Sequence, residues 1–322
     1  MRNRTEHDIK KNWPIGNVAP LVSIRCATCN HERFITDALD GFLNQETNFP
    51  FEIVVHDDAS TDKTAEIIRI YEKKYPSIIR AIYEEENQYS KRDGSLARIM
   101  NAACRGKYIA YCEGDDCWTN PHKLQMQIDL MESDLAVSLI HTNFTTIDEN
   151  GKNIERPHHQ SFFKYSKKEN GLVSLFEKNH IMTLTVVVRK EVLSMDMYLK
   201  CPFKYDYALF FSAAFLGKIK YIPMKTGAYR KVATSLMNSK LSVVSKDLKE
   251  VYLYFVNEYI ENKVPIRLID HFCIGSSILT NLVIFKKFNL IVRIIKKKPA
   301  WLMTLPLSVF KAFYLRFLVL IS

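Results

Sequence analysis

Three carboxylates lie within four residues, at Glu113-Gly114-Asp115-Asp116. They follow the apolar run 108–112, whose composition predicts a strand. Like charges this close repel, so they are tolerated best where a cation or strong hydrogen-bond donors neutralise them. Mg²⁺ prefers oxygen ligands and typically binds one or two carboxylates together with substrate phosphates. The stretch therefore predicts a site for a metal-bound phosphate compound, with an acidic loop that turns at Gly114 as the simpler alternative.

A second acidic pair, Asp57-Asp58, also follows a predicted strand. That strand, 51–56, is rich in Val and Ile, which is typical of a strand buried on both faces. In parallel sheets, ligands bind at the carboxyl ends of the strands, near the point where the strand order reverses. Two acidic clusters at one such edge favour a binding site over two unrelated acidic loops.

Strands and helices must position these carboxylates, and the sequence alternates between them. Strands are predicted at 21–26, 51–56, 78–83, 108–112 and 136–147, with helices at 31–45, 65–75, 95–104 and 121–133. Further on, the pattern predicts a helix at 172–178, a strand at 183–188, a helix at 208–216 and short extended pieces at 219–223 and 226–230. This order predicts an α/β fold with a mostly parallel, Rossmann-like sheet flanked by helices. No G-x-G-x-x-G follows the first strand and no G-x-x-x-x-G-K-[ST] is present, which disfavours dehydrogenases and P-loop NTPases.

The net charge of +10 is concentrated near the end of the chain. Residues 271–322 contain no acidic residue and these basic ones: Lys286, Lys287, Arg293, Lys296, Lys297, Lys298, Lys311 and Arg316. The remaining 270 residues are therefore nearly balanced at about +2, which argues against a nucleic-acid-binding body. With 322 residues, 47% of them hydrophobic, the chain is long enough for one large domain with an appendage, or for two domains.

The basic end of the chain is also apolar. Long helical patterns cover 241–263 and 267–286, and the very apolar segment 299–322 is about as long as a membrane-spanning helix. Pro306, Lys311 and Arg316 interrupt it, and charges inside a bilayer are costly. We therefore expect this segment to lie in a membrane interface, with packing on the body or on a partner as the alternative.

Two other candidate sites carry weaker signals. Cys26 and Cys29 form a C-x-x-C pair without a second pair at zinc-site spacing, so reduced thiols are the simpler interpretation. His158 and His159 are adjacent in a polar stretch, and loop histidines of this kind are usually solvated. The first residues, 1–8, are not followed by an apolar run, so we expect no signal peptide and a cytoplasmic location.

Several motifs occur together in the order in which one enzyme family carries them. They are Val22-Ser23-Ile24 with Asn30-His31-Glu32, the stretch Phe51 to Thr64 with Asp57-Asp58, Gly106-Lys107-Tyr108-Ile109-Ala110, Glu113-Gly114-Asp115-Asp116-Cys117-Trp118, and Lys123-Leu124-Gln125-Met126-Gln127. From about residue 20 to residue 235 the chain resembles the family 2 glycosyltransferases, which have the GT-A fold. The resemblance implies a GT-A domain at 21–238. The composition of the flanking segments adds a polar lead-in at 1–20 and a C-terminal helical region at 239–322, which we expect at a membrane interface.

The resemblance also implies roles for individual residues. The contacts to a nucleotide-sugar donor fall on Thr28, Asn30, Glu32, Asp57, Asp58, Asp115 and Arg230, with Asp57 and Asp58 beside the base and ribose and Arg230 near the diphosphate. Asp116, with Asp115, would bind Mn²⁺ or Mg²⁺. Relatives often place a histidine two residues after the arginine, where this chain has Val232, and a tyrosine where it has Cys117.

Asp206 matches the acidic residue that serves the family as general base. A carboxylate just before an apolar helix can instead be a simple N-cap, so both roles stay open at this point. An acceptor hydroxyl must lose a proton as it attacks, and a carboxylate within about 3 Å can accept it. Direct attack opposite the leaving group inverts the anomeric configuration and requires no covalent nucleophile.

The resemblance thus implies an inverting, metal-dependent glycosyltransferase that uses a UDP-sugar and a glycan or lipid-linked acceptor in cell-surface polysaccharide synthesis, peripheral on the inner face of the cytoplasmic membrane. One alternative is a nucleotidyltransferase, which would normally carry a glycine-rich basic loop where this chain has residues 27–32. Another is a non-catalytic nucleotide-sugar-binding module on the same fold.

Overall fold

A computed structural model describes residues 4–16, 18–154, 166, 171–232, 241–261, 268–284, 288–298 and 300–301. Its strands are β1 (Val22–Thr28), β2 (Phe51–Asp57), β3 (Ile79–Tyr83), β4 (Tyr108–Tyr111), β5 (Cys117–Trp118), β6 (Val137–Ile147), β7 (Val187–Arg189) and β8 (Lys218–Arg230). Its helices up to residue 216 are α1 (Glu6–Lys10), α2 (Ile35–Leu43), α3 (Thr64–Lys74), α4 (Ser95–Ala103), α5 (Lys123–Ser133), α7 (Gly171–Glu177), α8 (Asp196–Lys200) and α9 (Asp206–Leu216). The 3₁₀ helices are η1 (Tyr89–Lys91), η2 (Thr183–Thr185) and η3 (Lys190–Ser194). Three longer helices follow: α11 (Leu241–Glu261), α12 (Leu268–Ile284) and α13 (Phe288–Lys297).

The strands of the described residues form one eight-stranded sheet in the order β3-β2-β1-β4-β7-β6-β8-β5. β3, β2, β1 and β4 pair in parallel, β7 is antiparallel to both β4 and β6, and β6 pairs in parallel with β8. Only β7 and the short β5 therefore run against the other strands of this sheet. The predicted α/β class with a mostly parallel sheet is confirmed.

Two predicted elements differ from the structure. The segment predicted as a strand at 183–188 begins with the 3₁₀ helix η2, and strand β7 starts only at Val187. The two extended pieces at 219–223 and 226–230 belong to one strand, β8, which runs along β6. Pro223 and Met224 have no partner in this ladder, because the register shifts between Thr142 and Asn143. A proline without an N–H is accommodated at such an irregularity, and this explains why the sequence resembles two strands.

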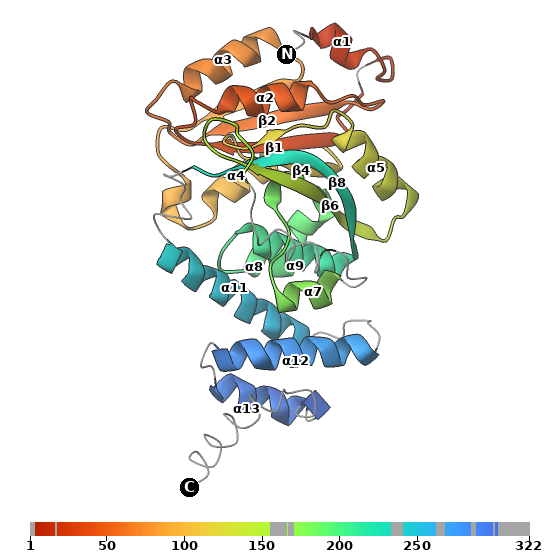
Figure 1. Cartoon of the computed structure of the whole chain (residues 1–322), viewed down its shortest axis with the longest axis vertical. Helices are drawn as coiled ribbons and strands as arrows, with labels where there is room; N and C mark the ends of the chain where they lie inside the picture. Colours follow the sequence, from red (N-terminus) through yellow and green to blue (C-terminus); the bar gives the residue numbers. More distant parts are fainter. Residues whose placement is uncertain are drawn as a thin grey trace.

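Helices cover both faces of the sheet (Figure 1). Helices α2 and α3 lie on one face, and α8, α9 and α7 lie on the other. The side chains of β1 alternate between the two faces, with Val22, Ile24 and Cys26 in the core below α2. β2 is buried along its whole length, as its Val- and Ile-rich sequence predicts.

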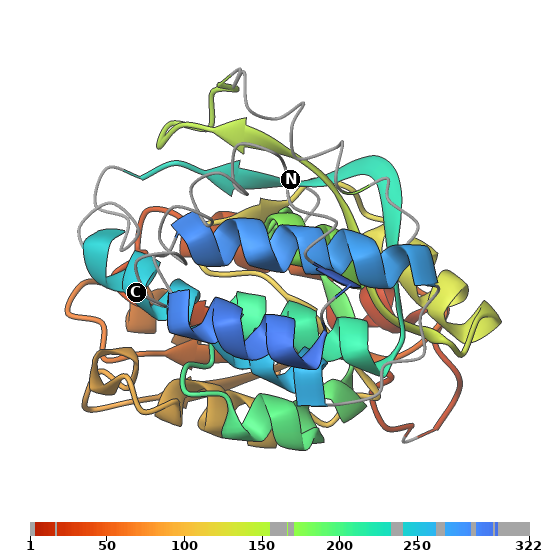
Figure 2. The same ribbon diagram turned by 90° about the horizontal axis from the view of Figure 1, so that it is seen from below.

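The C-terminal helices continue the core on the α9 side. Phe255 of α11 stacks on Phe211 of α9 with ring centroids 4.9 Å apart. Figure 1 shows α11, α12 and α13 following one another below this face, and Figure 2 shows α12 and α13 side by side from below. On α13, Ile291 and Ile294 are buried in the shared core. The region 239–322 therefore packs against the body through its described helices.

In the part of the chain that the structure describes, no helix is long and apolar enough to cross a membrane. The tail expected at a membrane interface, 299–322, lies outside the described residues except for residues 300–301. The adjacent histidines His158 and His159 also lie outside them.

Candidate active site

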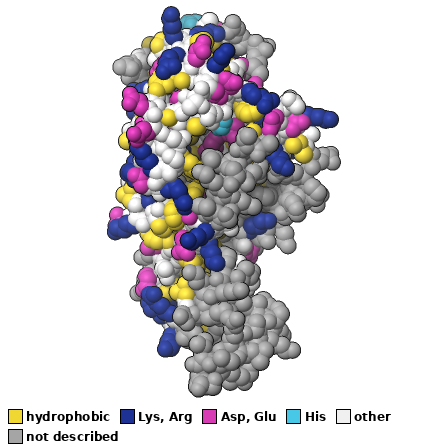
Figure 3. Space-filling model, turned by 90° about the vertical axis from the view of Figure 1, so that its left-hand side faces the viewer, with side chains coloured by type: hydrophobic (Ala, Val, Ile, Leu, Met, Phe, Trp, Pro, Cys, Tyr) yellow, Lys and Arg dark blue, Asp and Glu magenta, His cyan; other side chains and the backbone are white. Residues whose placement is uncertain are grey.

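The two acidic clusters meet at one edge of the sheet because their strands are neighbours of β1. Thr28 at the end of β1 pairs with Asp57 at the end of β2. On its other side β1 pairs with β4, where Arg25 lies opposite Tyr111. The chain leaving β4 continues along β1, with Gly114 N donating to Ala27 O at 2.9 Å. In the space-filling view of Figure 3, acidic side chains and a histidine lie together in a recess in the upper part of the molecule.

The acidic turn is partly buried, and Asp116 is its buried carboxylate. Asp116 is 5% exposed, and one of its carboxylate oxygens accepts the backbone N–H of Arg230 at 2.8 Å. Burial, and then the charge of Asp115, raise the pKa of Asp116 well above its usual value. The same two causes raise the pKa of Glu113 to about 7. Asp115 is the more accessible carboxylate, and its Oδ2 lies 3.9 Å from Nε2 of His31.

The acidic turn fits a divalent cation whose coordination is completed by a substrate. In the described residues no group of three or more His, Cys, Asp and Glu side chains is arranged to bind a metal ion. Asp115 and Asp116 supply two neighbouring carboxylates, which suits Mg²⁺ or Mn²⁺ bound partly through phosphate oxygens. The raised pKa of Asp116 indicates a carboxylate without sufficient positive charge around it, and a bound cation would supply that charge.

Arg230 supports the turn through protein contacts. Its Nε donates to the carbonyl of Asp115 at 2.9 Å, and its guanidinium pairs with Asp37 of α2 at 2.7 Å. The guanidinium also lies over the ring of Phe34, 4.8 Å from its centroid. Sequence reasoning missed Asp37, although a carboxylate in the first turn of a predicted helix is a recognisable signal. The neighbouring Val232 is 9% exposed and has no group that could bind a metal or a phosphate.

Asn30 and Glu32 connect two loops at the edge of the sheet. Oδ1 of Asn30 accepts the N–H of Thr61 at 2.8 Å, and Oε2 of Glu32 accepts the N–H of Lys63 at 3.0 Å. Asp62 completes the connection by accepting the N–H of Glu32 at 3.0 Å. These side chains thus hold the loop after β1 against the loop after β2.

Asp57 at the end of β2 and Asp58 just after it are buried, and each is 3% exposed. Asp57 accepts the hydroxyl of Ser60. Asp58 accepts the backbone N–H groups of Gln88 and Tyr89 at 2.7 and 3.0 Å, so it fixes the loop that follows β3. Thr28 lies behind the acidic turn, and its hydroxyl is buried without a hydrogen-bond partner.

The predicted base, Asp206, is the first residue of α9, and the N-cap position belongs to Tyr205. One oxygen of Asp206 accepts the hydroxyl of Thr183 at 2.8 Å, and the other accepts the N–H of Tyr207 at 2.7 Å. Burial raises the pKa of Asp206, while these two hydrogen bonds oppose the increase. The charge of Asp206 also contributes to the raised pKa of Glu113.

The 3₁₀ helix η2 connects this carboxylate to the acidic turn, a link that no sequence motif indicated. Nε1 of Trp118 donates to the carbonyl of Leu184 at 2.8 Å. Nε2 of Gln127 donates to the carbonyl of Thr185 at 2.9 Å. Since Thr183 of the same short helix donates to Asp206, η2 ties β5 and α5 to the start of α9.

Lys123 supports this connection from inside the protein. It is fully buried, donates to Oε1 of Gln127 at 2.8 Å, and lies 4.2 Å from the ring centroid of Trp118. Burial lowers its pKa to about 7.

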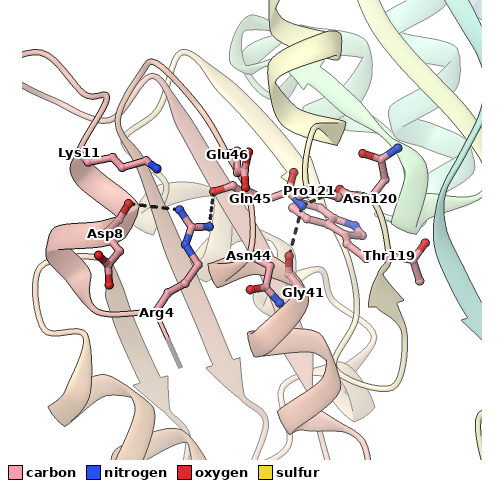
Figure 4. A pocket seen from close by; sticks show the side chains of 11 residues that line it. Arg4, Asp8, Lys11, Gly41, Asn44, Gln45, Glu46, Thr119, Asn120 and Pro121 are labelled. Atoms are coloured by element: carbon pink, nitrogen blue, oxygen red, sulfur yellow. Dashed lines mark hydrogen bonds between the residues drawn. The ribbon is translucent and has the colours of Figure 1, made fainter. Parts of the chain in front are cut away.

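A pocket of about 570 Å³ lies at the other end of α2, away from the acidic turn (Figure 4). It is lined by residues of the N-terminal segment, the end of α2 and the loop after β5, including Arg4, Gln45 and Asn120. The guanidinium of Arg4 donates to the carbonyls of Leu43 and Gln45, each at 3.1 Å. This pocket contains none of the residues expected to perform chemistry.

Comparison with known proteins identifies the family of this chain. The family described as Glycosyl transferase family 2 matches residues 23–194, more than half of the chain. An uncharacterised protein of Mycobacterium tuberculosis is 33% identical over 219 residues, which cover 68% of this chain and 61% of that protein. The chain therefore belongs to glycosyl transferase family 2, although the match spans less than two thirds of this relative. TuaG of Bacillus subtilis, named for teichuronic acid biosynthesis, is 26% identical over 234 residues, or 71% of this chain and 86% of TuaG.

Solved structures show the same fold at low sequence identity. TarS of S. aureus in complex with UDP-GlcNAc superposes with a TM-score of 0.61 at 18% identity, covering 91% of this chain and 83% of that one. A mannosyltransferase of Pyrobaculum calidifontis in complex with GDP-Man and Mn²⁺ gives a TM-score of 0.55 at 13% identity, covering 93% and 87%. The predicted GT-A fold is thereby confirmed.

The buried Lys123 gives a testable pH dependence of stability. In the folded chain its pKa is about 7, whereas the unfolded chain retains the ordinary value of 10.5. Between these values the unfolded state binds more protons, so Lys123 makes the folded state more stable as the pH rises. In urea unfolding at pH 7, 8 and 9, we expect the free energy of unfolding of the wild type to rise relative to that of Lys123→Met. The difference should grow by up to about 1.4 kcal/mol per pH unit. Parallel pH dependences of the two proteins would contradict the lowered pKa.

Proposed function

We propose that this chain is an inverting glycosyltransferase that moves a sugar from a nucleoside-diphosphate donor to a hydroxyl of a glycan or lipid-linked acceptor. The observation that carries the proposal is the hydrogen-bonded connection through η2, which links Asp206 to Trp118, two residues after the Asp115-Asp116 turn. The complexes of TarS with UDP-GlcNAc and of the mannosyltransferase with GDP-Man support a nucleotide-sugar donor. We favour a UDP-sugar, and the name of TuaG supports a role in cell-surface polysaccharide synthesis.

Asp116, with Asp115, would hold Mn²⁺ or Mg²⁺, and the bound ion would neutralise the charge that develops on the departing diphosphate. The Mn²⁺ in the mannosyltransferase complex supports this assignment. We assign the nucleotide side of the site to the walls built by Thr28, Asn30, Glu32, Asp57 and Asp58. Their contacts fix the loops after β1, β2 and β3, so they shape the space that a base and ribose would occupy. Arg230 contributes indirectly, because its hydrogen bond to the carbonyl of Asp115 fixes that residue.

Asp206 would accept the proton of the attacking hydroxyl. Its burial makes the carboxylate more basic, and the hydroxyl of Thr183 fixes its orientation. The attacking oxygen forms the new bond to the anomeric carbon while the bond to the diphosphate breaks on the opposite face. One displacement inverts the configuration, and no nucleophilic side chain is needed.

We further propose that the protein works on the inner face of the cytoplasmic membrane. The apolar side of α13 is buried against the body, whereas Arg293, Lys296, Lys297 and Lys298 are exposed. Lys and Arg side chains gather at the lower end of the molecule, where this helix lies (Figures 1 and 3). Among the described residues this surface would attract anionic headgroups by charge rather than by insertion.

Replacement of the base tests the proposed reaction. Asp206→Asn should lower the turnover number by about 100-fold or more, because general base catalysis typically contributes 10²–10⁴. The affinity for the nucleoside diphosphate should stay within about twofold, since an asparagine keeps the size of the side chain. Release of nucleoside diphosphate from a panel of nucleotide sugars with Mn²⁺ measures turnover and distinguishes a transferase from a binding module. Near-normal turnover of Asp206→Asn would exclude this base.

Thr183 provides a second test that does not remove the base. Its hydrogen bond lowers the pKa of Asp206, so Thr183→Val should raise that pKa. Because only the ionised carboxylate accepts a proton, the acid limb of the pH–rate profile should move to higher pH. Thr183→Ser keeps the hydroxyl and serves as the control. An unchanged acid limb in Thr183→Val would show that Asp206 does not set it.

The basic surface of α13 can be tested with lipid vesicles. Near an anionic surface each lysine contributes about 1 kcal/mol, so Lys296→Gln with Lys298→Gln should weaken binding to phosphatidylglycerol vesicles by about 30-fold. Lys73→Gln with Lys74→Gln, on α3 at the opposite end of the molecule, is the control (Figure 1). Cosedimentation measures the binding. Equal loss in both double variants would mean that net charge, not this surface, determines it.

A further inference from the structure

Asp247 of α11 is a buried carboxylate with partners from two distant segments. It is 3% exposed. It accepts the hydroxyl of Tyr205 at 2.8 Å and forms an ion pair with Arg92. Arg92 and Tyr205 are more than 100 residues apart in the sequence, so the carboxylate joins segments that the chain itself does not hold together.

Both segments border the candidate active site. Tyr205 directly precedes Asp206 and is the N-cap residue of α9. Arg92 ends the loop whose backbone N–H groups, at Gln88 and Tyr89, bind Asp58. Arg92 also has a φ of 56°, a left-handed conformation that is uncommon outside glycine and needs support from its surroundings.

Tyr89 brings the two segments into contact near the base. Burial raises its pKa, a hydrogen bond with Tyr205 opposes the increase, and the charge of Asp206 adds to it. Tyr89 and Tyr205 therefore lie within hydrogen-bond reach of each other.

Helix α11 can serve as a rigid support for this carboxylate. Its Phe255 is fully buried and stacks on Phe211 of α9. Helix α11 begins below the sheet on the side of α4 and crosses beneath α8 and α9 (Figure 1). A buried carboxylate is costly unless it is paired, and for stability alone an apolar side chain would often serve as well. The pairing of Asp247 with Tyr205 and Arg92 therefore indicates a role other than stability.

We propose that Asp247 is a positioning residue, through which the C-terminal helix α11 fixes both Tyr205 beside the base and the loop 88–92 beside the nucleotide side. This inference rests on the proposed transferase function. It makes α11 part of the catalytic unit, in addition to any role of the C-terminal helices at a membrane.

Three substitutions at Asp247 test the proposal in the full-length protein. Asp247→Ala removes the link, Asp247→Asn removes the charge but keeps an acceptor for Tyr205, and Asp247→Glu restores the carboxylate. We expect the turnover number to fall about tenfold or more in the alanine variant, less in the asparagine variant and least in the glutamate variant. The dissociation constant for the nucleoside diphosphate should change less than threefold. Lys246→Ala, at an exposed neighbour on the same helix, should change neither.

Tyr205→Phe is a milder variant that removes only the hydroxyl that donates a hydrogen bond to Asp247. It should lower turnover several-fold, and its combination with Asp247→Ala, which removes the acceptor, should be less harmful than the product of the two separate effects. Additive effects in this double-mutant cycle would overturn the link between the two residues.

Hydrogen exchange provides a readout independent of activity. In Asp247→Ala the amides of residues 88–92 and 205–207 should exchange faster than in the wild type and in Lys246→Ala. Unchanged exchange, or faster exchange with unchanged turnover, would overturn the positioning role. A wild type that releases no nucleoside diphosphate from any donor would overturn the proposed function, and with it a role of Asp247 in transfer, whereas the exchange comparison would still decide whether Asp247 holds the two segments.

Discussion

The structure depends on keeping three carboxylates of one short turn in place without a cationic side chain bonded to any of them. Among the described residues, no Lys or Arg side chain hydrogen-bonds to the carboxylates of Glu113, Asp115 or Asp116. Asp116 relies on a backbone N–H, and Arg230 bonds to the carbonyl of Asp115 instead. Burial and mutual repulsion therefore raise the pKa of Asp116 and Glu113. A site with this excess negative charge favours a divalent cation and the diphosphate that accompanies it.

Because no Lys or Arg side chain among the described residues hydrogen-bonds to these carboxylates, the position of the turn must come from the surrounding frame. The backbone N–H of Gly114 donates to β1 and fixes one end of the turn. Trp118 fixes the other end, because its buried ring donates to the carbonyl of Leu184. The η2 helix then transmits this position to Asp206, whose own neighbours are held by Asp247 from α11. The two halves of the site are thus fixed by contacts between elements that are far apart in the sequence. Such contacts suit a reaction in which the base and the leaving group must be held to within about 0.5 Å of the productive geometry.

Much of this frame could be predicted from the sequence, and the rest could not, for physical reasons. The apolar strands before Asp57 and Glu113 determine which edge of the sheet carries the carboxylates, since parallel strands end together. Side-chain partners are set by tertiary packing and leave no local signal in the sequence. The sequence therefore did not indicate that Asp58 binds the loop at 88–89 or that Asp247 accepts the hydroxyl of Tyr205. Similarly, Lys123 in an amphipathic helix resembles a surface residue, although the fold buries it beneath Trp118.

The central claim is that the Asp115-Asp116 turn binds a divalent cation together with a nucleoside diphosphate. Calorimetric titration of the nucleoside diphosphate, with and without Mn²⁺, tests it most directly. In the wild type and in Asp206→Asn, Mn²⁺ should raise the affinity by about tenfold or more, a coupling of about 1.4 kcal/mol. In Asp116→Asn this coupling should disappear. Equal affinity of the wild type with and without Mn²⁺ would contradict the account.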